Sequence, residues 1–175
     1  MQTYRNLNKG WTSMSQTNYL LKLQDKFLKY PFGRTLFSKV FASQAPYFKS
    51  IKPKILNLET NFCQVLIPKR KPVQNHIGTV HAIAICNALE MAMGAMTEAS
   101  IPKNLRWLPK GMNVNYLAKS TTDIIAEAKI NPEQWQVGDV SVSVRALDSH
   151  GTVVVDGEIR LWLSEKPVKQ CINRL

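Results

Sequence analysis

The sequence predicts an α+β fold, in which one long central helix is wrapped by a curved, mainly antiparallel sheet. Several short segments alternate apolar and polar residues, as strands with one buried face do. A single run at 79–98 is apolar almost all round, which is typical of a helix covered on most of its sides. Turn signals at 131–134 and 148–151 join later segments as hairpins, so helices and strands occupy separate stretches of the chain.

The length of the chain indicates one globular domain with an addition at each end. Its 175 residues are 45% hydrophobic and 20% charged, which suits a protein that buries a sizeable core. We divide the chain into an N-terminal helical extension over 1–48, a domain over 49–165 and a C-terminal tail over 166–175.

The N-terminal part predicts helices. Leu20, Leu23 and Phe27 recur at helical spacing along 17–30, lysines fall on the other side, and Pro31 ends the pattern. Further helical turns are expected at 34–43 and 45–49. A basic amphipathic helix of this kind can lie on a membrane surface, but packing against its own domain is the more frequent outcome.

The remaining segments predict strands on either side of the long helix. Two extended runs at 51–58 and 61–68 precede the helix, and the loop PKRKP at 68–72 leads toward it. After the helix, Val140, Val142 and Val144 alternate with polar residues, which predicts a strand with one buried face. Four strands are expected there, at 105–118, 122–130, 138–147 and 152–163.

The net charge of +11 is unevenly distributed. Residues 1–71 hold 13 Lys and Arg against 2 Asp and Glu, whereas residues 72–175 hold 10 of each. A basic surface attracts phosphates, anionic membranes or nucleic acid, and a solvated face without a partner is an equally open interpretation. Aromatic residues do not interleave with the basic ones as a single-strand binding platform requires, so we expect no nucleic acid.

The sequence also bears on location. The first residues lack the apolar segment of a signal peptide. The run Val80–Thr97 approaches membrane-spanning length, but His81, Asn87 and Glu90 interrupt it. We therefore expect a cytoplasmic protein without a membrane span. The cysteines have no disulfide or zinc spacing and are interpreted as reduced thiols; they are Cys63, Cys86 and Cys171.

The start of the long helix is a candidate binding site. Gly78 and Thr79 lead into it, and Thr79 is the expected N-cap. The backbone N–H groups near His81 and Ala82 then lie in the first turn, where they carry partial positive charge and can bind a developing oxyanion. Asn75 brings an amide side chain to the same region.

Glu90 places a carboxylate in the middle of this apolar helix. It lies nine residues after His81, about two and a half turns, so the two side chains point to opposite faces. One chain can hardly bring both to one substrate, whereas two chains about a two-fold axis can. The spacing suggests a site shared between subunits of a homodimer or a dimer of dimers. The structural alternative is a buried or edge carboxylate tied to a neighbour, with His81 as a capping or core residue.

No metal or cofactor is expected. His76 and His81 are five residues apart, not the four that would place two ligands on one face of a helix. The sequence has no glycine-rich phosphate loop and no credible hydrolase triad.

The motif Asn75-x-x-Gly78-Thr79-x-His81, followed by Glu90, resembles the hotdog-fold acyl-CoA thioesterases. Among the named groups, it is most similar to the PaaI-like and 4-hydroxybenzoyl-CoA thioesterase-like ones. It resembles still more an uncharacterised bacterial branch, which has a similar helix and a following RW-x-PKGM strand. That strand is 106–112 in this chain. The likeness in element order runs from about residue 50 to residue 163, and it does not cover residues 1–45.

The resemblance implies a role for each matching residue. Glu90 matches the general base or nucleophile, and Ala82 the position whose backbone N–H polarises the thioester carbonyl. Asn75 matches a polar residue that orients substrate or water, and His81 a mainly structural histidine. The family usually has His-Gly-Gly, whereas this chain has His-Ala-Ile at 81–83, so a Cβ restricts how closely a thioester can approach.

We therefore expect a thioester hydrolase acting on acyl-CoA or a related small molecule. Gly78 and Thr79 are expected to line the substrate site. The basic residues of the PKRKP loop can contact the CoA phosphates or be solvated; these are Lys69, Arg70 and Lys71. The alternative function is a non-catalytic protein of the same fold that binds acyl groups or CoA. A binder of anionic membranes or nucleic acid is a third possibility, based on charge alone.

Overall fold

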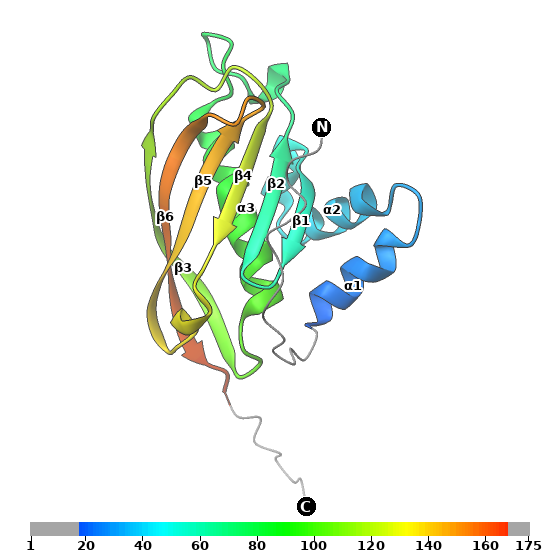
Figure 1. Cartoon of the computed structure of the whole chain (residues 1–175), viewed down its shortest axis with the longest axis vertical. Helices are drawn as coiled ribbons and strands as arrows, with labels where there is room; N and C mark the ends of the chain where they lie inside the picture. Colours follow the sequence, from blue (N-terminus) through cyan, green and yellow to red (C-terminus); the bar gives the residue numbers. More distant parts are fainter. Residues whose placement is uncertain (1–17, 168–175) are drawn as a thin grey trace, which may run out of the picture.

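The computed structural model describes residues 18–167 (Figure 1). Most of the predicted tail, part of the predicted N-terminal extension and Cys171 lie outside the described residues. The assignment of the chain to these three parts stays a prediction.

The strands form one six-stranded antiparallel sheet in the order β1-β2-β4-β5-β6-β3. The sheet curves round one long helix, which confirms the predicted fold class (Figure 1). All six expected strands are present, with ends shifted by a few residues. Their bounds are β1 Lys54–Glu59, β2 Phe62–Ile67, β3 Leu105–Tyr116, β4 Ile124–Lys129, β5 Gly138–Asp148 and β6 Val153–Glu165.

The long helix α3 (Ala82–Ser100) packs against the inner face of this sheet, mainly on β2 and β4. Twelve of its residues are buried. Ala88, Ala92 and Ala95 are among them, and their small side chains allow the sheet to approach the helix axis closely. Most of the apolar surface predicted for this helix is therefore covered within a single chain.

Three helical segments precede the sheet, as the sequence predicts. They are α1 (Tyr19–Leu28), α2 (Gly33–Gln44) and the 3₁₀ helix η1 (Pro46–Ile51). Phe37 of α2 is buried, with its ring 6.0 Å from that of Phe27 in α1. The Ser38 hydroxyl accepts a hydrogen bond of 2.9 Å from the Ile55 N–H of β1, so α2 covers that edge of the sheet. Packing of α1 on its own domain is thus confirmed.

The strand β3 forms the opposite edge of the sheet and pairs with β6 on one side. Pro109 is tolerated because an edge strand has one side without ladder hydrogen bonds, and the register shifts between Pro109 and Gly111. Lys110 bonds Asp139 at 2.5 Å and lies 5.2 Å from the centre of the Trp162 ring. Among residues 18–167, no helix is long and apolar enough to cross a membrane.

Candidate active site

The loop before α3 is held by hydrogen bonds between Asn75 and Thr79. The Asn75 N–H donates to the Thr79 carbonyl at 2.9 Å, and Asn75 Nδ2 donates to Thr79 Oγ1 at 2.8 Å. Asn75 Oδ1 accepts from the N–H groups of Thr79 and Ile77. Gly78 has a φ of 77°, a conformation that glycine adopts without strain. Thr79 therefore belongs to this loop, and it does not cap the helix as predicted.

His81 is the N-cap of α3 instead. Its Nδ1 accepts a hydrogen bond of 3.1 Å from the Ile83 N–H, and its carbonyl accepts from the N–H groups of Ala84 and Ile85. The helix begins at Ala82, three residues later than expected, because the hydroxyl of Thr79 is already bonded to Asn75. An N-cap whose side chain accepts a backbone N–H is what satisfies a helix start.

Among the first four backbone N–H groups of α3, that of Ala82 differs because it has no hydrogen-bond acceptor among the described residues. The N–H groups of the next three residues all have partners, whereas the Ala82 N–H donates to no described residue. Ala82 is also half-buried and sits at the positive end of the helix dipole. The N–H that is expected to polarise the thioester carbonyl thus has no acceptor within residues 18–167.

Glu90 lies on the open face of α3 and is exposed, so it is not buried, one of the two forms that the structural alternative allowed. Ile83 and Cys86 precede it by seven and four residues, so all three share one side of the helix. Among the described residues, Glu90 has no hydrogen-bond or ion-pair partner. Residues 18–167 therefore hold no neighbour to which this carboxylate is tied.

The open face of α3 adjoins the edge strand β3. Cys86 Sγ lies 3.6 Å from the Tyr116 hydroxyl, and the Trp107 Nε1–H donates to Glu98 Oε1 at 2.7 Å. The hydrogen bond with Cys86 raises the pKa of Tyr116 above its usual value. The side chains of Ile83 and Tyr116 are more than half exposed here. The result is a partly apolar surface that includes Glu90 and the unpaired strand edge.

A buried polar cluster next to this face was not anticipated from the sequence. Asn87 on α3 is buried, and its Nδ2 donates to the Tyr47 carbonyl and the Ser50 hydroxyl of η1 at 3.4 and 3.3 Å. Arg70 donates to the Ser50 carbonyl. Asn87 Oδ1 and Arg70 Nε have no hydrogen-bond partner in the described part of the chain, so this polar cluster is incompletely satisfied there. The asparagine within an apolar run was its only sequence signal.

The basic residues of the PKRKP loop divide into two kinds. Lys69 Nζ donates to the Thr121 carbonyl at 2.9 Å, and Arg70 is tied to Ser50, so both hold neighbouring backbone in place. Lys71 is exposed, and its side chain makes no hydrogen bond or ion pair with a described residue. Of the three, Lys71 has the freest charge.

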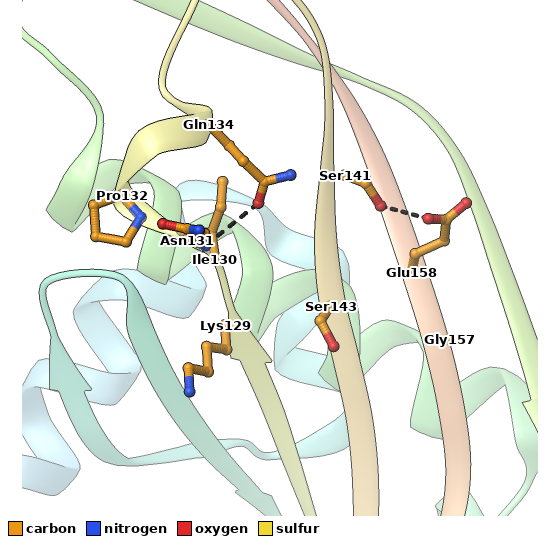
Figure 2. A pocket seen from close by; sticks show the side chains of 9 residues that line it. All are labelled: Lys129, Ile130, Asn131, Pro132, Gln134, Ser141, Ser143, Gly157 and Glu158. Carbon is orange, nitrogen blue, oxygen red and sulfur yellow. Dashed lines mark hydrogen bonds between the residues drawn. The ribbon is translucent and has the colours of Figure 1, made fainter.

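A hollow of about 850 Å³ lies on the outer face of the sheet, between β4, β5, β6 and the turn at 131–134 (Figure 2). Lys129, Ser141 and Glu158 line it, and the Ser141 hydroxyl donates to the Glu158 carboxylate. None of the predicted site residues borders it. No group of three potential metal ligands occurs among the described residues.

Solved structures share this architecture. The crystal structure of a structural-genomics target is 41% identical, with a TM-score of 0.75, and the match covers 85% of this chain and 99% of that chain. A Pseudomonas aeruginosa protein of unknown function, described as a probable thioesterase, is 19% identical, with a TM-score of 0.68 and coverage of 78% and 97%. A thioesterase from Haemophilus influenzae is 10% identical, with a TM-score of 0.66 and coverage of 78% and 94%.

These likenesses define the protein as one of the hotdog fold, with its long helix enclosed by the curved sheet. A family model, "Domain of unknown function (DUF4442)", matches residues 33–163, and the chain belongs to that family. The match begins at the first residue of α2, so the family unit includes a helix that precedes the sheet. No curated protein matches the chain.

Proposed function

We propose that this protein hydrolyses thioesters, with acyl-CoA as the substrate class, through Glu90 and the start of α3. The observation that supports the proposal is that this hotdog fold presents two groups without hydrogen-bond partners among the described residues, a carboxylate and a backbone N–H. Among residues 18–167, the exposed carboxylate of Glu90 has no partner, and the Ala82 N–H at the helix N-terminus has no acceptor. Structural neighbours described as thioesterases support the reaction class.

In the proposed mechanism, Glu90 takes a proton from a water molecule, and the water oxygen attacks the thioester carbonyl carbon. The carbonyl oxygen becomes negatively charged and is stabilised by the Ala82 N–H and the helix dipole. Collapse of this intermediate breaks the carbon–sulfur bond. The proton held by Glu90 passes to the departing thiolate, which leaves a free carboxylic acid and a thiol.

The two groups belong to different subunits in this proposal. Ala82 and Glu90 are eight residues apart, which is about 12 Å along a helix. A general base and an oxyanion donor must both lie within about 3 Å of the reacting atoms, so one helix cannot supply both. A second copy of the chain that pairs along β3 covers the unpaired strand edge, since long exposed edges invite pairing. A dimer of dimers is compatible with the same contact.

In this proposal, the acyl part of the substrate contacts apolar side chains, and the nucleotide part contacts a basic residue. The exposed apolar side chains of Ile83 and Tyr116 border the proposed site and suit an acyl group. Lys71 is the free basic residue closest in sequence to the loop before α3, and it is our candidate for a phosphate contact. Gly78 and Thr79 then act by shaping the loop over the helix start.

A non-catalytic acyl or CoA-binding role is the second candidate. The observation that favours it is Ile83, whose side chain is exposed beside Ala82 where the related motif has glycine. A branched side chain at this point narrows the approach to the Ala82 N–H. Such a site would bind a thioester without bringing its carbonyl into reach of the donor.

The test is a screen of the purified full chain against CoA thioesters with short, long and aromatic acyl groups, with release of free thiol as the readout. Glu90→Gln keeps the shape of the side chain and removes the base, so we expect kcat to fall by about a hundredfold or more. Glu90→Asp serves as the matched variant that retains a carboxylate. Equal hydrolysis by wild type and Glu90→Gln contradicts the assignment. Saturable binding without turnover by any variant supports the second candidate.

A further inference from the structure

We propose that the connection between α1 and α2 is a docking site for an anionic membrane surface. This inference concerns where the protein acts, and it does not depend on the proposed hydrolysis. The connection, residues 29–32, projects from the domain beyond the sheet edge opposite β3 (Figure 1). We call this connection, with the adjoining ends of α1 and α2, the helical corner.

Large apolar side chains are exposed at the helical corner. Within nine residues of chain, Leu28, Tyr30, Phe32 and Leu36 are exposed by 42, 71, 87 and 52%. Phe32 is the N-cap of α2, and its carbonyl accepts a hydrogen bond of 3.1 Å from the N–H of Leu36 in the first turn of that helix. Scattered apolar residues are normal on a surface, but four large ones on a single tip indicate an interaction site.

The tip is rigid, so this exposure is built into the fold. The Tyr30 N–H donates to the Phe27 carbonyl at 3.1 Å, and the Gly33 N–H donates to the Tyr30 carbonyl at 3.0 Å. A Cβ on Gly33 would lie 1.7 Å from the Phe27 carbonyl oxygen, so only glycine fits there. Phe32 has a φ of 61°, which is unusual for a bulky side chain. The turn thus holds its aromatic rings in solvent before any partner arrives.

The positive charge around the helical corner indicates an anionic partner. Between residues 26 and 54 the chain has seven Lys and Arg and no Asp or Glu. Four of these basic residues flank the exposed apolar tip and are themselves exposed; they are Lys26, Lys29, Arg34 and Lys39. Aromatic side chains with basic neighbours suit the headgroup region of a bilayer, where rings enter the interface and cations meet anionic lipids.

The shape of the helical corner favours a bilayer over an acidic protein. A bound peptide or helix usually lies in a groove, whereas these exposed residues belong to a turn that projects from the domain. The apolar inner sides of α1 and α2 are already used within the chain, through Leu20, Leu23 and Phe37. The helical corner also lies at the edge away from β3, so a second copy paired along β3 leaves it free.

The experiment is sedimentation of the full chain with vesicles of phosphatidylcholine alone and with equimolar phosphatidylcholine and phosphatidylglycerol. We expect binding only to the anionic vesicles, weakened by added salt. Tyr30→Ser, Phe32→Asn and Leu36→Ser combined should weaken binding by about tenfold or more. Asparagine is chosen at Phe32 because it tolerates a positive φ.

Matched variants distinguish binding through the helical corner from non-specific binding of the protein to vesicles. Lys29→Gln with Arg34→Gln should also weaken vesicle binding, whereas Lys119→Gln with Lys129→Gln should leave it unchanged. Val137→Ser removes an exposed apolar side chain elsewhere and should have no effect. Thermal unfolding shows that each variant is folded, and Phe32→Trp should shift its fluorescence to the blue on anionic vesicles.

Four results would overturn the proposal. The first is the absence of binding to both kinds of vesicle. The second is equal binding by the wild type and the triple apolar variant. The third is a fall in solution mass of the triple variant without vesicles, since the helical corner would then be a contact between copies of the chain. Binding to an added acidic protein, with no vesicle binding, also counts against it.

Discussion

Asn75 and Thr79 are joined by three hydrogen bonds, two through the Asn75 side chain and one between their backbones. They close the loop that delivers the chain to the N-cap His81. The free N–H of Ala82 is therefore positioned by a loop whose geometry depends on one asparagine.

Asn75→Ala should lower the free energy of unfolding by about 1–2 kcal/mol, because its side chain serves three partners in this loop. Thr79→Val should lower the free energy of unfolding by less, since Asn75 Oδ1 keeps its hydrogen bonds from the backbone N–H groups. Urea denaturation measures both, with Asn104→Ala as an exposed control. If Asn75→Ala leaves stability unchanged but abolishes turnover, Asn75 acts directly on substrate or water.

Asp148 should make the stability of the β5–β6 hairpin depend on pH. Its Oδ1 accepts from the N–H groups of Thr152 and His150, each at 2.9 Å, and the bond from Thr152 contributes most to lowering the pKa of Asp148. A lowered pKa stabilises the folded state above the pKa of the unfolded chain, and this stabilisation is lost as the pH falls through the folded pKa.

Asp148→Asn keeps an acceptor for both donors but cannot titrate. Wild type should therefore lose more stability than Asp148→Asn between neutral and acidic pH, as measured by urea denaturation at each pH. Asp148→Ala should be less stable than both at neutral pH, because it removes the acceptor. The same acid dependence in wild type and Asp148→Asn would contradict the assignment.

The element order was predictable because alternation and capping residues are local signals. Val140, Val142 and Val144 showed by alternation alone which side of β5 is buried. The helix start was less predictable, because Thr79 is a good N-cap in isolation. Its hydroxyl bonds to Asn75 in the folded chain, and the cap passes to His81.

Exposure around the site could not be predicted from the helix sequence. The run from Val80 is apolar on all sides, so periodicity does not tell which face the sheet leaves open. That face turns out to carry Ile83, Cys86 and Glu90 because the sheet covers the side with the alanines. Likewise, no local pattern distinguishes the tethered Lys69 from the free Lys71.

Lys71→Gln should raise the KM for CoA thioesters several-fold and leave kcat nearly unchanged, because an exposed charge contributes to binding more than to chemistry. The effect should shrink at high salt, where the screening length falls to about 3 Å. A pantetheine thioester lacks the nucleotide and should not respond. Lys69→Gln should affect both substrates alike, since Lys69 supports the Thr121 backbone.

Ala82→Pro should remove the proposed oxyanion donor without disturbing the helix. Ala82 is the first helical residue, where proline is well tolerated, and His81 has the extended ψ of 136° that suits a residue before proline. We expect kcat to fall by about a hundredfold to a thousandfold, with little change in thermal stability. Ala82→Ser retains the N–H and is the control. Full activity in Ala82→Pro would place the oxyanion elsewhere.

The shared site leads to a complementation experiment with the same two residues. A dimer of one Ala82→Pro chain and one Glu90→Gln chain has one site with both defects and one site with none. Unfolding and refolding an equal mixture makes half of the dimers mixed, so activity should return to about a quarter of wild type. A mixture of Glu90→Gln and Glu90→Ala should recover nothing, because every site then lacks the carboxylate. If the first mixture is no more active than its components, both groups act within one chain, or the two do not form a common site.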